Sequence, residues 1–97
     1  MRSSHDRSWT FLTNHARVLL CIARDPGIRL RDVAYRVGIT ERATQAIVAD
    51  LVAGGYMDRK RVGNRNRYDV HRNGAFRHAM ERPYDVGALL DVLAPEP

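Results

Sequence analysis

The sequence predicts one small domain that is mainly α-helical and carries a single β-hairpin. Apolar residues recur at helical spacing in four separate segments, and glycine, proline or asparagine falls between them. From Tyr56 the pattern changes to two short strand-like runs. The chain has 97 residues, of which 44% are hydrophobic, and this suits one compact core.

A first helix is predicted from His15 to Arg24. Thr13 or Asn14 can cap it by accepting a hydrogen bond from an amide of its first turn. Asp25-Pro26-Gly27 ends it, because proline cannot continue a helix and this string favours a turn. Ile28-Arg29-Leu30 can then form a short extended segment.

Two further helices follow, with a tight turn between them. The first runs from Leu30 to Val37 and ends at Gly38, since glycine tolerates the left-handed conformation. Thr40 is placed to cap the second helix, from Glu41 to Ala53. The predicted apolar stripe of that helix consists of Thr44, Ile47, Val48 and Leu51.

The hairpin is predicted from two strands, Tyr56–Val62 and Arg67–Val70. Gly63-Asn64-Arg65-Asn66 joins them and contains residues that accept left-handed backbone. A last helix is predicted from Asp85, a good cap, to Leu93.

The segment from Leu30 to Arg42 meets the requirements of a helix-turn-helix. Ala34 is small where two helices cross closely, Gly38 makes the turn, and Ile39 buries between the helices.

Charge is concentrated in the hairpin that follows. Sixteen basic residues against eleven acidic ones give a formal net charge of +5, and such a balance favours a polyanion as partner. Asp58 and Asp69 are the only acidic residues in or beside the hairpin. Its basic residues are Arg59, Lys60, Arg61, Arg65, Arg67 and Arg72. A protruding ribbon with this charge reaches phosphates or a minor groove.

On these residues the chain resembles bacterial winged helix-turn-helix transcriptional regulators of the MarR-like and ArsR-like groups, above all small single-domain members from actinobacteria. The strings that carry the resemblance are Trp9–Leu20, Gly38–Ala43 and Gly63–Tyr68. The resemblance implies a mainly α fold with a β-hairpin wing: a three-helix core, a two- or three-stranded wing and a C-terminal helix. Typical MarR-like proteins are longer, and their extra terminal helices form a dimer and a small-molecule pocket, so an effector stays an open question here.

The domain organisation follows from this resemblance. Residues 1–8 are expected to form a flexible tail, 9–82 the DNA-binding domain, and 83–97 a C-terminal helix that serves as a possible dimerisation element. The predicted function is sequence-specific binding of double-stranded DNA. The alternatives are a winged-helix protein–protein interaction module and a nonspecific nucleic-acid binder.

The expected mechanism places the recognition helix, 41–53, in the major groove and the basic wing, 57–70, on the backbone or minor groove. Arg42 can bond a guanine and Gln45 an adenine, each with two hydrogen bonds. The predicted DNA-binding residues are Arg29, Arg31, Thr40, Glu41, Arg42, Ala43, Gln45, Ala46, Arg59, Arg61, Asn64, Arg65, Asn66 and Arg67.

A homodimer is expected, because a monomer of this size covers few base pairs. The candidate surfaces are the Leu89-Leu90-Val92-Leu93 face and the Trp9-Phe11-Leu12 cluster, unless these two cover each other within one chain. A two-fold dimer would set its recognition helices roughly 34 Å apart and favour a palindromic site.

Other classes of protein are not indicated. No run approaches the roughly 18 apolar residues of a membrane span, and residues 1–8 are not followed by the apolar region of a signal peptide, so we expect a cytoplasmic protein. Cys21, the only cysteine, is expected to be a buried free thiol. No phosphate-binding glycine loop, nucleophile elbow or metal-ligand spacing is present, so we expect neither an enzyme nor a metal or cofactor.

Overall fold

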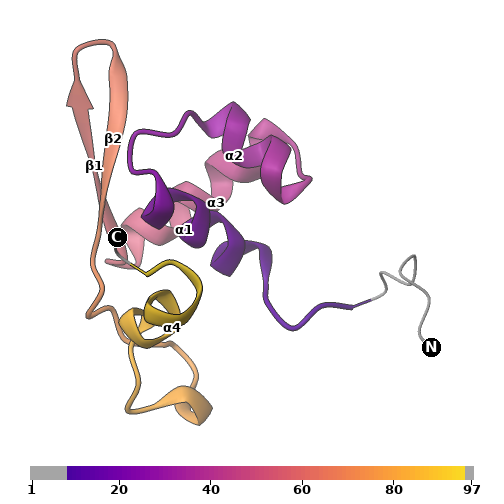
Figure 1. Cartoon of the computed structure of the whole chain (residues 1–97), viewed down its shortest axis with the longest axis vertical. Helices are drawn as coiled ribbons and strands as arrows, with labels where there is room; N and C mark the ends of the chain where they lie inside the picture. The colour runs from indigo at the N-terminus through magenta and orange to yellow at the C-terminus, as the bar shows by residue number, and fades with distance from the viewer. Residues whose placement is uncertain (1–8, 96–97) are drawn as a thin grey trace.

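A computed structural model describes residues 9–95 of the chain, and the predicted tail at residues 1–8 lies outside them. Across the described residues the fold is four α-helices, a short 3-10 helix and one antiparallel hairpin. The elements in order are α1 (Asn14–Arg24), α2 (Leu30–Val37), α3 (Glu41–Ala53), β1 (Met57–Val62), β2 (Arg65–Val70), η1 (Ala79–Glu81) and α4 (Val86–Leu93). The hairpin stands beside the α1–α3 group, and α4 lies below it, next to α1 (Figure 1).

The predicted helices are confirmed to within one residue at each end. Three of them begin at the predicted kind of cap. The side chains of Thr13, Thr40 and Asp85 accept hydrogen bonds from the backbone N–H three residues on, at 3.2, 3.0 and 3.3 Å. Gly38 ends α2 in the left-handed conformation, with φ at 85°. Local chemistry therefore determines where these helices begin and end.

The hairpin differs from its prediction in length. The predicted four-residue link is wrong: the loop is only Gly63-Asn64, β2 begins at Arg65, and Val62 pairs with Arg65. Gly63 has a left-handed φ of 63°, and every residue with a positive φ in the described chain is a glycine. Glycine first in a two-residue loop is the type II′ pattern, whose twist matches that of antiparallel strands. Arg65 and Asn66 are therefore ladder residues.

The sheet has two strands among the described residues, so the three-stranded form of the wing is wrong. Within the predicted extended segment at residues 28–30, Arg29 has extended backbone but belongs to no strand, and Leu30 already begins α2. One hydrogen bond remains in place of a strand pairing. The N–H of Tyr68 donates to the carbonyl oxygen of Pro26 at 3.0 Å, so the turn after α1 lies against the edge of β2.

The main core lies between α1, α2, α3 and the root of the hairpin. Val18, Ile22, Val33, Val48 and Met57 are fully buried in it. The predicted stripe of α3 is buried as expected, and its polar member, Thr44, donates its hydroxyl proton to the carbonyl of Thr40 at 2.9 Å. Cys21 is confirmed as a buried free thiol within this core.

Helix α4 closes a second, smaller core. Leu90 is fully buried against Leu20 and Ala94, with Leu12 and Leu93 packed at the edge. The guanidinium of Arg24 donates to the carbonyl oxygen of Leu93 at 2.6 and 3.2 Å, which holds the end of α4 on α1.

The predicted apolar surfaces divide accordingly. Leu12 and Leu90 are covered within one chain, whereas Trp9, Phe11 and Val92 stay exposed at 67%, 92% and 76%. None of the described helices is long and apolar enough to cross a membrane.

Leu90→Ala is expected to lower the free energy of unfolding by about 2–5 kcal/mol, because it leaves a cavity where α4 meets α1. Val92→Ala, on the exposed side of the same helix, is the matched control and is expected to change it by less than about 0.5 kcal/mol. Urea unfolding measures both. Equal effects of the two substitutions would contradict the packing of α4 described here.

Candidate nucleic-acid interface

The outer face of α3 is the first component of the candidate interface. Because the apolar stripe faces the core, Glu41, Arg42, Gln45 and Ala46 are all exposed. Thr40 is exposed too, and its oxygen accepts the Ala43 amide while leaving the hydroxyl proton free to donate. Ala43, predicted to face outward with them, is half-buried, so it forms part of the edge of this surface.

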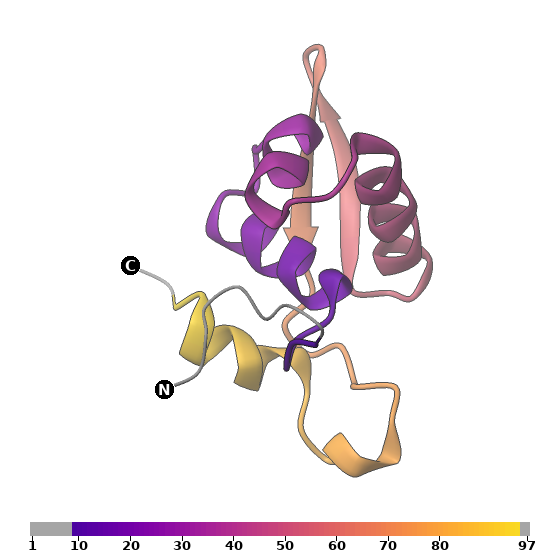
Figure 2. The ribbon, with the colours of Figure 1, turned by 90° about the vertical axis from the view of Figure 1, so that its right-hand side faces the viewer.

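The hairpin is the second component, and it points the same way as the start of α3. Figure 2 shows the first turn of α3 and the hairpin tip at the same end of the molecule, while α4 lies at the other end. The end of α3 leads into the root of the hairpin, whereas the start of α3 and the tip of the hairpin both face this end of the molecule. A partner that approaches this end meets both.

The strand register divides the basic residues of the hairpin between two faces. Arg59 lies opposite Tyr68 and Arg61 opposite Asn66, on the face that begins with buried Met57. Lys60 lies opposite Arg67 on the other face, beside Arg65. The predicted hairpin residues thus do not form one patch. Arg59, Arg61, Asn64, Arg65 and Arg67 are nevertheless all exposed, and Asn66 is half-buried.

Lys60 is a residue that the predicted site left out. Its direct cross-strand neighbour is a second cation, Arg67, and neither forms an ion pair within residues 9–95. Like charges directly opposite each other destabilise a sheet unless something neutralises them. Asp58 and Asp69, the next pair on the same face, supply carboxylates two residues away, and the register that reveals both pairs was not visible from composition alone.

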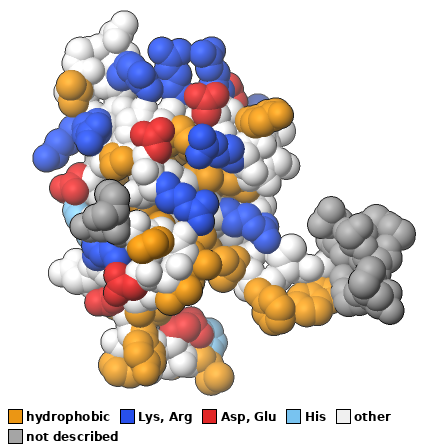
Figure 3. Space-filling view, viewed as in Figure 1, with side chains coloured by type: hydrophobic (Ala, Val, Ile, Leu, Met, Phe, Trp, Pro, Cys, Tyr) orange, Lys and Arg blue, Asp and Glu red, His pale blue; other side chains and the backbone are white. Residues whose placement is uncertain are grey.

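A basic cleft separates the hairpin from α2 and is the third component. It has a volume of about 550 Å³ and is lined by Arg29, Arg31, Arg36 and Arg65, with Asp25 and Asp32 also on its walls. The Arg65 guanidinium donates to the carbonyl oxygen of Gly27 at 2.5 Å, which holds this arginine at the cleft. Lys and Arg side chains gather at the upper end of the same face, from the hairpin to α2 (Figure 3). Arg36 was missed, although it follows Arg29 by seven residues, which is two helical turns.

His71 connects the end of α3 to the root of the hairpin. Its Nδ1 lies 2.8 Å from the carbonyl oxygen of Gly55, and its Nε2 lies 3.0 Å from Oδ2 of Asp58. Both partners accept, and only the protonated imidazole donates from both nitrogens. The Gly55 carbonyl and then the Asp58 carboxylate raise the pKa of His71 above 6.5. Protonated His71 thus links Gly55, just after α3, to Asp58 near the start of β1.

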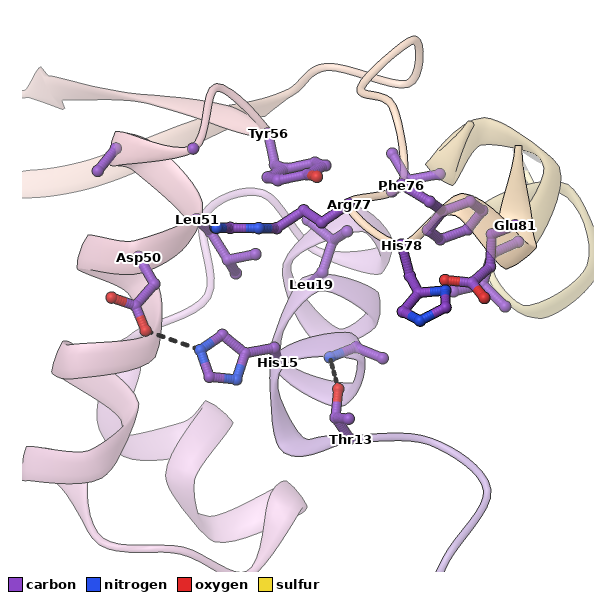
Figure 4. A pocket seen from close by; sticks show the side chains of 15 residues that line it. Thr13, His15, Leu19, Asp50, Leu51, Tyr56, Phe76, Arg77, His78 and Glu81 are labelled. Carbon is purple, nitrogen blue, oxygen red and sulfur yellow. Dashed lines mark hydrogen bonds and ion pairs between the residues drawn. The ribbon is translucent and has the colours of Figure 1, made fainter. Parts of the chain in front are cut away.

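An apolar pocket of about 710 Å³ lies away from the basic end, between α1, the second half of α3, the loop before η1, and α4. Leu19 and Leu51 form part of its wall, and His15 bonds Asp50 across it at 2.8 Å (Figure 4). Figure 4 also shows the Arg77 side chain crossing the pocket beneath the Tyr56 ring. The volume is that of a small-molecule site. Side chains of both charge signs line the pocket, so its charge does not favour a cationic or an anionic ligand, and its apolar wall favours an apolar one.

The His71 contacts generate a pH prediction. Because the folded-state pKa is raised, the stability from protonated His71 is complete below pH 6.5 and is lost as the pH rises through the folded-state pKa. Asp58→Asn removes one cause of the shift, so the His71 pKa should fall relative to the parent. Asp69→Asn removes only the weakest of the contributions and serves as control. Imidazole NMR titrations measure all three, and an unchanged pKa in Asp58→Asn would contradict the contact.

Comparison with known proteins leaves the family of this chain open: no family model matches it, and no curated protein matches it. The described residues also contain no group of three or more His, Cys, Asp or Glu side chains placed to hold a metal ion. The case for a function therefore depends on the geometry of the exposed basic end.

Proposed function

We propose that the protein is a cytoplasmic transcriptional regulator that binds double-stranded DNA sequence-specifically as a winged helix-turn-helix. The observation that carries the proposal is that the exposed, capped start of α3 and the tip of the basic hairpin lie toward the same end of the molecule (Figure 2). An α-helix fits the major groove, and a basic ribbon next to it meets the phosphate backbone or the minor groove.

In the proposed complex α3 reads base edges. Arg42 contacts a guanine and Gln45 an adenine, each of which offers two groups that match the side chain. Glu41 accepts from a cytosine amino group or acts favourably on the positive end of the helix dipole. Ala46 is small and exposed, so it permits close approach or contacts a thymine methyl group.

The hairpin and the start of α2 supply the affinity. Phosphates receive most of the hydrogen bonds in protein–DNA complexes, and arginine is well suited to donate them. Arg42 is the only basic residue of α3, whereas the hairpin and α2 contain many. This distribution also favours the second candidate, a nonspecific nucleic-acid binder, so the experiment must separate sequence preference from affinity.

Arg42→Ala and Gln45→Ala are each expected to reduce the preference for a site selected from random duplex DNA by roughly 5- to 100-fold over a mismatched site. Arg77→Ala, at the opposite end of the molecule, is the matched arginine control and should leave the preference unchanged. Competition binding with both DNAs measures the ratio.

Three other outcomes are informative in different ways. Salt-dependent binding without any preference in the parent would replace the proposal with the nonspecific binder. No binding at low salt would leave the protein–protein interaction module. A preference that survives both substitutions would show that α3 does not read the bases.

We further propose that two copies pair through their exposed apolar residues. Trp9 and Phe11 form an edge-to-face pair with ring centroids 5.1 Å apart, and both rings are largely exposed. Val92 is exposed on α4, beyond the side that packs on α1. Removing residues 85–97 would not test this proposal cleanly, because Val86 and Leu90 belong to the core.

Phe11→Ser combined with Val92→Asp is therefore the better test of the dimer. Neither residue is buried, so the fold should persist while self-association weakens by at least about tenfold, as apolar area is lost and a charge is added. Sedimentation equilibrium measures the association constant, and circular dichroism checks the fold. A parent that is monomeric at high concentration, or an unchanged association, would refute these surfaces.

A further inference from the structure

The amino end of α2 is the one α-helix start in the described chain without a side-chain cap. Arg29 occupies the cap position and forms no side-chain hydrogen bond there. The amides of Asp32 and Val33 donate to the Arg29 carbonyl, but those of Leu30 and Arg31 donate to no group within residues 9–95. Free amides and the helix dipole together attract an anion, although a helix start alone does not make a site.

Cations surround these amides. Arg29 and Arg65 line both the 550 Å³ cleft and a second hollow of about 260 Å³ that continues from it toward Asn64 and Asn66. Arg65 reaches this position from the hairpin and is held by the Gly27 carbonyl. Arg31 and Arg36 line the wider part, where Asp25 and Asp32 balance only part of the charge. The hollow thus combines amide donors with guanidinium groups from two separate elements.

A buried hydroxyl is the independent observation. Tyr68 is 3% exposed and lines the smaller hollow together with Arg29 and Arg65. Its hydroxyl is the only buried side-chain polar atom of the described residues that has no hydrogen-bond partner. Burying an unpaired hydroxyl costs about 1–3 kcal/mol, and a ligand oxygen that entered the hollow beside Tyr68 would offer the partner that this hydroxyl lacks.

We propose that the cleft between the amino end of α2 and the hairpin binds a phosphate group. The amides of Leu30 and Arg31, the guanidinium groups of Arg29 and Arg65, and the hydroxyl of Tyr68 supply its donors. The phosphate belongs either to the backbone of bound DNA, which rests on the proposed function, or to a free phosphate-bearing small molecule, which does not. In both cases occupancy ties the hairpin to the helix-turn-helix segment.

The first arm of the test uses no DNA. Inorganic phosphate is titrated into the whole chain by calorimetry at constant ionic strength, and its dissociation constant is compared across variants. Arg29→Gln and Arg65→Gln are each expected to weaken binding about tenfold, as loss of a charge-assisted bond does. Tyr68→Phe is expected to weaken it about fivefold. Arg77→Gln, an exposed arginine outside the cleft, should stay within about twofold of the parent.

Tyr68→Phe separates binding from structure. Removing an unpaired buried hydroxyl should leave the phosphate-free protein at least as stable as the parent, while phosphate binding falls. A melting temperature that rises or stays level beside weaker phosphate binding therefore supports a ligand contact. Parent-like phosphate binding in this variant would remove Tyr68 from the site.

The second arm identifies the source of the phosphate. If DNA supplies it, Arg29→Gln and Arg65→Gln each reduce the slope of log affinity for duplex DNA against log salt by about one unit. If a free molecule supplies it, the two variants lose phosphate binding but keep the parent slope. Unchanged phosphate binding together with an unchanged slope overturns the proposal. Failure of the parent to bind DNA would count against the proposed function and leave the first arm intact.

Discussion

The rest of the structure depends on how α3 buries one stripe of side chains. Ile47, Val48 and Leu51 pack against α1 and α2, and the Thr44 hydroxyl is satisfied by the backbone one turn earlier. Because α3 packs on the core along this one stripe, its opposite face is exposed to solvent. The exposure of Arg42 and Gln45 is a consequence of core packing, and it determines where a partner can meet this helix.

The helices were predictable because their boundaries are set by neighbours in the chain. A threonine or aspartate cap binds the amide three residues further on, and a glycine just after the last turn ends the helix. Both signals act within one helical turn, so they can be recognised in the sequence. The hairpin was less predictable for a physical reason. Gly63, Asn64 and Asn66 all favour turns, and local preference does not say which two of them form the loop. Pairing between Val62 and Arg65 decides it.

The candidate site follows the same division. Arg42 and Gln45 were found from helical periodicity, since their outward direction follows from the apolar stripe. Lys60 and Tyr68 were missed because their roles depend on cross-strand pairing and on burial against a distant segment. Which basic residues of the hairpin share a face was not predicted either, because this follows from the strand register. Contacts between residues far apart in the sequence cannot be inferred from composition or local pattern.

The buried side chains of the hairpin lie toward its root, while beside the loop the Arg65 guanidinium bonds the Gly27 carbonyl, and this has a mechanical consequence. Met57 and Tyr68 are its buried residues, whereas the last two pairs before the loop lie outside the core. Bending at the tip of the hairpin accumulates from small changes at each pair; it moves no buried side chain, but it works against the hydrogen bond between Arg65 and Gly27. Its tip can follow surfaces of different width at little strain, at the expense of conformational entropy when it is immobilised. Stiffness at the root and compliance at the tip are thus built from the same two strands.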